Sequence, residues 1–145
     1  MRKIVLCTGG FDPIHSGHIK YLQEARNLGD MLVVGINSNA WLERKKGYAF
    51  MSSDDRITIL QNLKMVSHCI LFNDDNGTAL EAINNVKMMY PNDHIIFANG
   101  GDRDSLDALP ERSAKDVEFV FGVGGIKTRS SSEILANWTK HNTDK

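Results

Sequence analysis

Hydrophobic segments alternate with helix-like patterns along the whole chain. The segments that predict β-strands cover residues 2–8, 31–37, 67–72, 94–99 and 117–122. The first, second and fourth are almost continuous runs of apolar, mostly β-branched residues and leucine, as in parallel strands that are buried on both faces. The intervening segments repeat apolar residues at helical spacing, in residues 19–28, 53–63, 80–90 and 130–138.

Strands that alternate with helices predict right-handed crossovers and a parallel sheet covered on both faces. We therefore expect an α/β fold, a Rossmann-like doubly wound sheet of five parallel strands. Ser53 and Ser130 are the expected caps of the second and the last helix. One domain is expected over residues 1–141, and residues 142–145 are expected to form a frayed tail.

Polar clusters follow three of the predicted strands. Residues 8–18 follow the first strand, 99–102 the fourth, and 130–132 begin the helix after the fifth. In an open parallel sheet the carboxyl ends of the strands meet at one edge, where ligands bind at the switch in strand order. The three clusters are therefore expected to share one site. The glycine-rich segments 99–104 and 122–126 are expected to form part of its wall.

The composition narrows the class of ligand. The chain has 145 residues, 41% of them hydrophobic, and a formal net charge of -1. It has no basic patch for nucleic acid, no apolar run long enough to span a bilayer and no signal-peptide pattern. We expect a cytoplasmic protein that binds small molecules and neither nucleic acid nor membrane. Cys7 and Cys69 lie in apolar segments, which favours buried small hydrophobes over a disulfide or redox pair.

The most specific motif is the segment Gly10-Phe11-Asp12-Pro13-Ile14-His15-Ser16-Gly17-His18. It follows a buried strand and predicts a glycine turn that leads into a helix. A helix N-terminus attracts phosphate, and two histidines three residues apart share one helix face. Phosphate contact is the favoured role. The alternatives are a half-site for a metal, with no obvious further ligand nearby, and a structural role.

The pattern G-x-F-D-x-x-H-x-G-H resembles the signature of the HxGH nucleotidyltransferase superfamily, in particular its cytidylyltransferase family, which includes glycerol-3-phosphate cytidylyltransferases. The similarity continues through residues 19–20, 25–30 and 32–34. It returns at residues 45–46, at Arg56, and at residues 100–102 and 130–132. The resemblance thus covers most of the chain and implies the Rossmann-like fold that the hydrophobic pattern predicts independently.

The resemblance also implies roles for individual residues. Those expected to be catalytic are His15, His18, Lys46 and Arg56. Those expected to bind nucleotide are Thr8, Gly9, Gly10, Phe11, Asp12, Gly17, Gly100, Gly101, Asp102, Arg129, Ser130, Ser131 and Ser132.

Several of these residues have a second interpretation. Asp12 is equally suited to hold a turn. The alternative for Arg56 is an arginine on the surface. Lys45 and Lys46 cannot be distinguished by sequence, and both fit a solvated basic loop. Residues 130–132 fit a helix cap as well as a phosphate site.

The implied function is transfer of CMP from CTP to a small phosphorylated alcohol or sugar, with release of pyrophosphate. One alternative is an ATP-dependent adenylyltransferase acting on a heptose phosphate, because Gly100-Gly101-Asp102 resembles that group at least as well. Another is a nucleotide-binding regulator without turnover, which the intact histidine pair disfavours. Mg²⁺ is expected, held mainly by the nucleotide phosphates and water rather than by a protein metal site. The resemblance also implies a homodimer.

Overall fold

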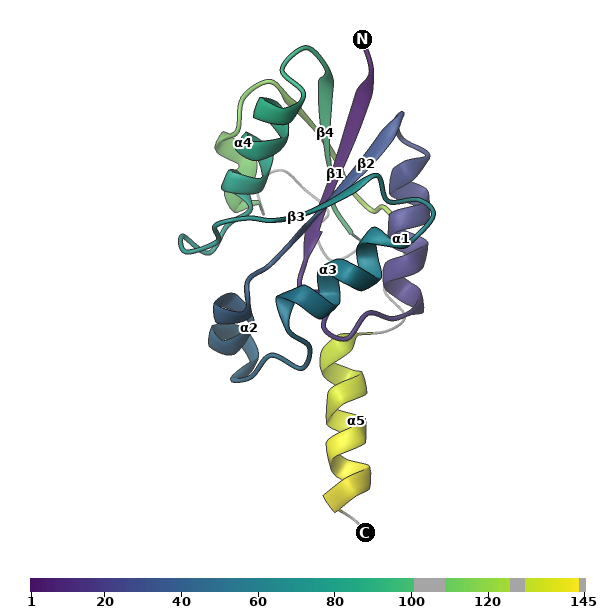
Figure 1. The fold of residues 1–145 in the computed structure, drawn as a ribbon, viewed down its shortest axis with the longest axis vertical. Helices are drawn as coiled ribbons and strands as arrows, with labels where there is room; N and C mark the ends of the chain where they lie inside the picture. Colours follow the sequence, from purple (N-terminus) through teal and green to yellow (C-terminus); the bar gives the residue numbers. More distant parts are fainter. Residues whose placement is uncertain (101–108, 126–129, 144–145) are drawn as a thin grey trace.

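The computed structural model describes residues 1–100, 109–125 and 130–143. Within them a parallel sheet forms in the strand order β3-β2-β1-β4-β5 (Figure 1). The strands are β1 (Lys3–Gly9), β2 (Met31–Ile36), β3 (His68–Leu71), β4 (His94–Ala98) and β5 (Val117–Val120). The expected α/β, Rossmann-like fold is confirmed, with each strand within two residues of its predicted ends.

The strand order reverses beside β1, the central strand. The chain first builds outward through β2 and β3, then crosses to the opposite side of β1 to form β4 and β5. Leu6 therefore pairs with Val33 on one side and with Phe97 on the other. The carboxyl ends of β1 and β4 flank this switch point, where the connections leave in opposite directions and a crevice forms.

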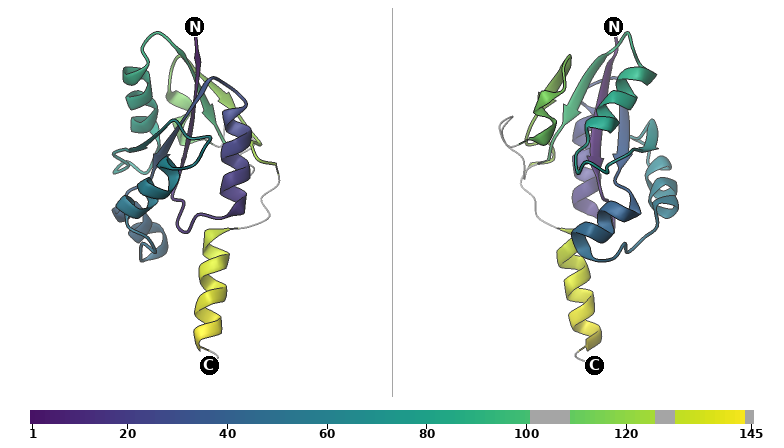
Figure 2. Two further views of the ribbon diagram at one scale, coloured as in Figure 1. Left: turned by 45° about the vertical axis from the view of Figure 1, so that its right-hand side comes forward. Right: turned by 90° about the vertical axis from the view of Figure 1, so that its left-hand side faces the viewer.

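Helices cover both faces of the sheet (Figure 2). Helices α1 (Ser16–Arg26) and α3 (Ser53–Gln61) pack on one face, and α4 (Leu80–Met89) packs on the other. The chain also forms α2 (Asn39–Lys46), α5 (Ser131–Thr143) and a short 3-10 helix, η2 (Pro110–Ser113).

Alternate residues of β1 enter two separate cores. Val5 and Cys7 pack with residues of α1 and α3, whereas Ile4 and Leu6 pack with α4. The period of two along a strand explains why a nearly continuous apolar run is needed to fill both layers.

Three local expectations are corrected. Ser52, not Ser53, caps α3, because its hydroxyl accepts from the Asp55 amide. Helix α2 was not expected: it buries only Leu42 and ends in the basic residues interpreted as a loop. Helix α5 continues to Thr143, so residues 142 and 143 are helical rather than frayed.

Helix α5 extends away from the sheet (Figure 1) and has no buried residue. Ser130 caps it as expected, accepting from the Glu133 amide at 3.1 Å. In the described part of the chain, no helix has both the length and the apolar character needed to cross a membrane.

Gly29 joins α1 to β2 at a point where the backbone runs against β1. A Cβ atom there would lie 2.7 Å from the Lys3 carbonyl oxygen and 2.9 Å from a Val5 methyl. We expect Gly29→Ala to lower the free energy of unfolding by about 1–3 kcal/mol, as overpacking does. The exposed Gln23→Ala on α1 is the control, with a change within about 0.5 kcal/mol. Urea denaturation of both variants measures the difference, and an unchanged midpoint for Gly29→Ala would contradict the close approach.

Candidate active site

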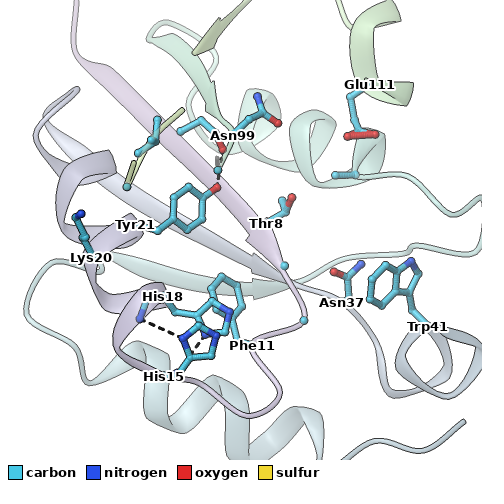
Figure 3. Close-up of a pocket in the computed structure, with 18 of the residues that line it drawn as sticks. Thr8, Phe11, His15, His18, Lys20, Tyr21, Asn37, Trp41, Asn99 and Glu111 are labelled. Carbon is cyan, nitrogen blue, oxygen red and sulfur yellow. Dashed lines mark hydrogen bonds between the residues drawn. The ribbon is translucent and has the colours of Figure 1, made fainter. Parts of the chain in front are cut away.

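A cavity of about 270 Å³ opens at the carboxyl edge of the sheet, at the switch point between β1 and β4. Its wall combines the turn after β1, the start of α1, the ends of β2 and β4, and the loop after β5 (Figure 3). Among the described residues that line it are Thr8, Gly9, Gly10, Phe11, His15, Gly17, His18, Lys20, Tyr21, Asn37, Trp41, Lys45, Thr78, Asn99, Gly100, Glu111, Gly124 and Gly125.

His15 and His18 face each other at the start of α1 (Figure 3). Their ring centroids are 3.9 Å apart and the ring planes differ by 28°. His15 is the N-cap residue: its Nδ1 accepts from the Gly17 amide at 3.1 Å, and His18 Nδ1 accepts from the His15 amide at 3.2 Å. Since Nδ1 is the acceptor in both rings, the proton of each neutral imidazole is on Nε2.

The helix cap thus fixes the tautomer as well as the position of both histidines. Both imidazole rings line the cavity beside the positive end of the α1 dipole, and the Nε2 atom of His15 is buried. This arrangement suits a phosphate group.

Gly9 and Gly10 bring the backbone of the turn to the cavity wall. A Cβ at Gly10 would lie 3.0 Å from a Leu42 methyl, and one at Gly9 would lie 3.2 Å from the Phe11 ring. Phe11 adopts φ 52° and is buried, with its ring edge-on to His18 at a centroid distance of 4.9 Å. Its ring therefore supports a histidine, while the turn's backbone borders the cavity.

Asp12 holds the turn after β1, as its second interpretation allows. Its side chain is fully buried, and its carboxylate accepts from the amides of Phe50 and Met51 at 2.7 and 2.6 Å. Lys46 Nζ donates to the Asp12 carbonyl at 2.7 Å. Asp12 and Lys46 together tie the turn after β1 to the segment before α3, and neither lines the described cavity.

Arg56 is buried, so the alternative interpretation of a surface arginine is wrong. The residue is 1% exposed. Nη1 donates to the carbonyls of Gly10 and Asn37 at 3.0 and 2.6 Å, Nε to the Met51 carbonyl at 3.2 Å, and Nη2 to Asn39 Oδ1 at 2.9 Å. Four of its N–H donors are thus engaged within the protein. Burial lowers the pKa of Arg56, and the Asp12 carboxylate is the largest of the opposing effects.

The two adjacent lysines of α2 are distinguished by the fold. Lys45 lines the cavity, with its Nζ 4.6 Å from the centroid of the Trp41 ring, whereas Lys46 holds the turn. Because α2 is helical, consecutive side chains point in different directions, about 100° apart. Lys45 is therefore the lysine placed to meet a ligand.

Asp74 anchors the start of α2. Its carboxylate accepts from the Ser38 hydroxyl at 2.7 Å, the Ser38 amide at 2.8 Å and Asn37 Nδ2 at 3.2 Å. Burial acts to raise the pKa of Asp74, but the hydrogen bonds from Ser38 and Asn37 outweigh it and the pKa is lowered. Asp74 is thus a charged acceptor that fixes Asn37 and the N-cap of α2.

The second glycine segment is only partly described. Asn99 and Gly100 line the cavity. The Asn99 amide donates to the Val120 carbonyl, and the Asn99 carbonyl accepts from the Val123 amide; these bonds join the ends of β4 and β5. Gly101, Asp102 and Arg129 lie outside the described residues.

The serines before and at the start of α5 lie near the turn after β1. Ser131 donates to the Pro13 carbonyl at 2.7 Å, and Ser130 caps the helix. Ser130, Ser131 and Ser132 do not line the described cavity.

Sequence reasoning missed several residues of the wall: Tyr21, Asn37, Trp41, Thr78 and Glu111. Asn37 directly follows the second strand. Because the carboxyl ends of all parallel strands meet at the ligand-binding edge, the same argument that selected residues after the first and fourth strands could have found Asn37. The others carry no local signal. Both cysteines are free; Cys7 is buried as expected, whereas Cys69 is half-buried. Burial raises the pKa of Cys7 to about 12 and that of Cys69 to about 11.

The contacts of Arg56 predict a loss of stability on substitution. Arg56→Lys keeps the charge but leaves buried carbonyls without donors, so we expect the free energy of unfolding to fall by about 2–4 kcal/mol. Arg44→Lys, exposed on the last turn of α2, is the matched control and should change it by less than about 0.5 kcal/mol. Chemical denaturation compares the two. Equal stability of the two variants would argue for the surface role instead.

The sequence matches a known family. The family model described as cytidylyltransferase-like covers residues 6–120. A bifunctional protein HldE of Campylobacter concisus is 37% identical over 129 residues, which form 88% of this chain and 26% of that protein. That of Pelobacter propionicus is 42% identical over 103 residues, 70% of this chain and 20% of that protein. The chain thus spans about a quarter of the length of these relatives.

Solved structures agree with the sequence matches. A lipopolysaccharide core biosynthesis protein from Thermoplasma volcanium has a TM-score of 0.67 at 25% identity, covering 83% of this chain and 96% of that one. A bifunctional NMN adenylyltransferase/ADP ribose pyrophosphatase from Francisella tularensis also has a TM-score of 0.67, at 18% identity, over 97% of this chain and 43% of that one, which shows a shared fold. With the family model covering most of the chain, the protein belongs to the cytidylyltransferase-like family and is a nucleotidyltransferase.

Proposed function

We propose that the chain transfers an adenylyl group from ATP to the phosphate of a heptose-type sugar phosphate, releasing pyrophosphate. The observation that carries this proposal is the stacked pair His15 and His18 at the N-terminus of α1, in the wall of the cavity. The two imidazole rings and the helix dipole favour negative charge in the same part of the cavity.

The reaction makes one bond and breaks one. An oxygen of the acceptor phosphate bonds to the α-phosphorus of ATP, and the bond from that phosphorus to the bridging oxygen breaks, so the electron pair leaves with pyrophosphate. The attacking phosphate is already an anion, so no general base is required. Catalysis then depends on positioning and on stabilising charge on the phosphoryl oxygens. His15 and His18 supply the donors for that charge.

The similarity to HldE proteins supports ATP rather than the CTP that the sequence favoured. This similarity agrees with the sequence Gly100-Gly101-Asp102, which resembles the corresponding segment of heptose-phosphate adenylyltransferases. The relation to a lipopolysaccharide core biosynthesis protein adds support for a sugar phosphate as acceptor. The backbone of Asn99, Gly100, Gly124 and Gly125 in the cavity wall is suited to read a base edge.

Mg²⁺ and the homodimer stay predictions from the family resemblance. Among the described residues, no three His, Cys, Asp or Glu side chains are grouped to hold a metal. Mg²⁺ would accordingly be bound by the triphosphate and water, where it would neutralise charge on the leaving group.

His18 provides the first test. His18→Asn offers an amide oxygen in place of Nδ1 to accept from the His15 amide, but loses the Nε2–H donor. We expect turnover to fall by a factor of about 10²–10³, as for loss of one preorganised donor, with little change in stability. His68→Asn, exposed on β3, is the control. Pyrophosphate release measures the rate, and near-normal turnover of His18→Asn would remove His18 from the mechanism.

The nucleobase provides the second test. A site that pairs with one base leaves its own polar groups unsatisfied with another, which can give discrimination of roughly 10²-fold or more. We expect kcat/KM for ATP to exceed that for CTP by this margin, with a heptose phosphate as acceptor. Pyrophosphate release with each triphosphate measures the ratio. A preference for CTP would restore the cytidylyltransferase assignment and leave the chemistry of the histidines unchanged.

A further inference from the structure

The cavity continues beyond the histidines to a second group of side chains. In Figure 3, Asn37, Trp41 and Glu111 lie on the opposite side of Thr8 from His15 and His18. Lys45 and Thr78 line the same cavity and come from α2 and the loop before α4, next to this group in the fold. We call these five residues, Asn37, Trp41, Lys45, Thr78 and Glu111, the distal group.

The chemistry of the distal group differs from that of the histidine end. Glu111 lies on η2, is 1% exposed, and has its side chain in the cavity wall. A carboxylate only accepts hydrogen bonds, so it suits a ligand that presents hydroxyl donors. Asn37 and Thr78 add short polar side chains. Such a wall matches a polyhydroxylated molecule rather than an apolar one.

Trp41 gives this wall an aromatic face and Lys45 a positive charge. The Lys45 ammonium lies 4.6 Å from the centroid of the Trp41 ring. An indole face packs against the apolar C–H groups of a sugar ring, whereas an open-chain alcohol presents a much smaller surface to it. The ammonium is suited to a phosphate as a point charge.

The distal group is held rigidly at its α2 side. The Trp41 amide donates to the Ser38 hydroxyl at 3.0 Å, and Ser38 in turn donates to the buried carboxylate of Asp74. Asn37 Nδ2 donates to the same carboxylate at 3.2 Å. A wall fixed by a buried charge is preorganised, which lowers the cost of ordering it when ligand binds.

We propose that the distal group is the acceptor subsite and determines acceptor specificity. Glu111 accepts hydrogen bonds from sugar hydroxyls, Trp41 packs against the ring, and Lys45 pairs with the acceptor phosphate. This inference rests on the proposed function. In-line transfer needs the acceptor to approach the α-phosphorus opposite the leaving pyrophosphate. In this proposal the α-phosphorus is held at the histidines, and the acceptor is bound in the distal group of the same cavity.

The experiment compares KM for acceptor with KM for ATP in Glu111→Gln and Trp41→Ala. The acceptors are a heptose phosphate, a hexose phosphate and, as the compound without a ring, glycerol 3-phosphate. We expect KM for the sugar phosphates to rise roughly tenfold or more in each variant, with KM for ATP within about twofold of wild type, because a site loses discrimination when its hydrogen-bond partner is removed. Glu43→Gln, exposed on α2, is the matched control for a lost charge.

A second pair of measurements separates specificity from structural damage. Trp41→Phe keeps an aromatic face and should recover most of the affinity lost in Trp41→Ala. Calorimetry of sugar phosphate binding to protein saturated with a non-hydrolysable ATP analogue should show the same order of variants without turnover. If both Glu111→Gln and Trp41→Ala bind the sugar phosphates with unchanged affinity and turn them over with unchanged KM, the proposed acceptor subsite is overturned.

The failure of the subsite is distinguishable from that of the proposed function. If wild-type protein releases no pyrophosphate with ATP and any sugar phosphate, the proposed function fails and the subsite with it. If wild-type protein turns over sugar phosphates and the variants match it, the subsite alone fails. If KM for ATP rises as much as KM for acceptor, the distal group belongs to the nucleotide site and the assignment is overturned.

Discussion

The buried guanidinium of Arg56 is the interaction on which the geometry of the site depends. It bonds to the carbonyls of Gly10 after β1, Asn37 after β2 and Met51 before α3. Three segments that meet at the sheet edge are thereby fixed to one rigid, planar group with several donors. A buried charge is tolerated only when its donors are satisfied, and here four N–H groups have acceptors while the Asp12 carboxylate favours the charged form.

Arg56 donates to loop carbonyls, and two buried carboxylates accept from donors of the same loops, so that together they form a rigid frame around the site. Asp12 accepts from the amides of Phe50 and Met51, and Asp74 accepts from Ser38 and Asn37. Both satisfy polar groups of loops that would otherwise be costly to bury. Asp12, Arg56 and Asp74 therefore build the frame, whereas the cavity wall includes glycine backbone, the two histidines and the distal group. Holding the turn rigid in this way gives His15 and His18 a fixed geometry before any ligand arrives.

The position of the cavity follows from the strand order. Because β2 and β4 lie on opposite sides of β1, the connections after β1 and β4 diverge and open a crevice. The histidines lie on one side of Thr8, and Asn37, Trp41 and Glu111 lie on the other (Figure 3). A reaction between two phosphorylated molecules needs such an arrangement, with one molecule on each side of the group transferred. The matched residues make up 26% and 28% of two HldE relatives, so this unit corresponds to one part of those proteins.

The sequence by itself determined what depends on neighbours along the chain. Apolar runs predicted the strands, spacing of three placed His15 and His18 on one helical turn, and Ser130 was identified as a cap, because each of these rests on contacts within a few residues. The tertiary structure decided the rest. Asp12 meets an amide 39 residues away and Arg56 a carbonyl 46 residues away. Lys45 and Lys46 differ only once α2 packs, and Trp41 and Glu111 reach one cavity from opposite halves of the sheet. Local propensity carries no information about such pairs, since they are made by the packing of distant segments.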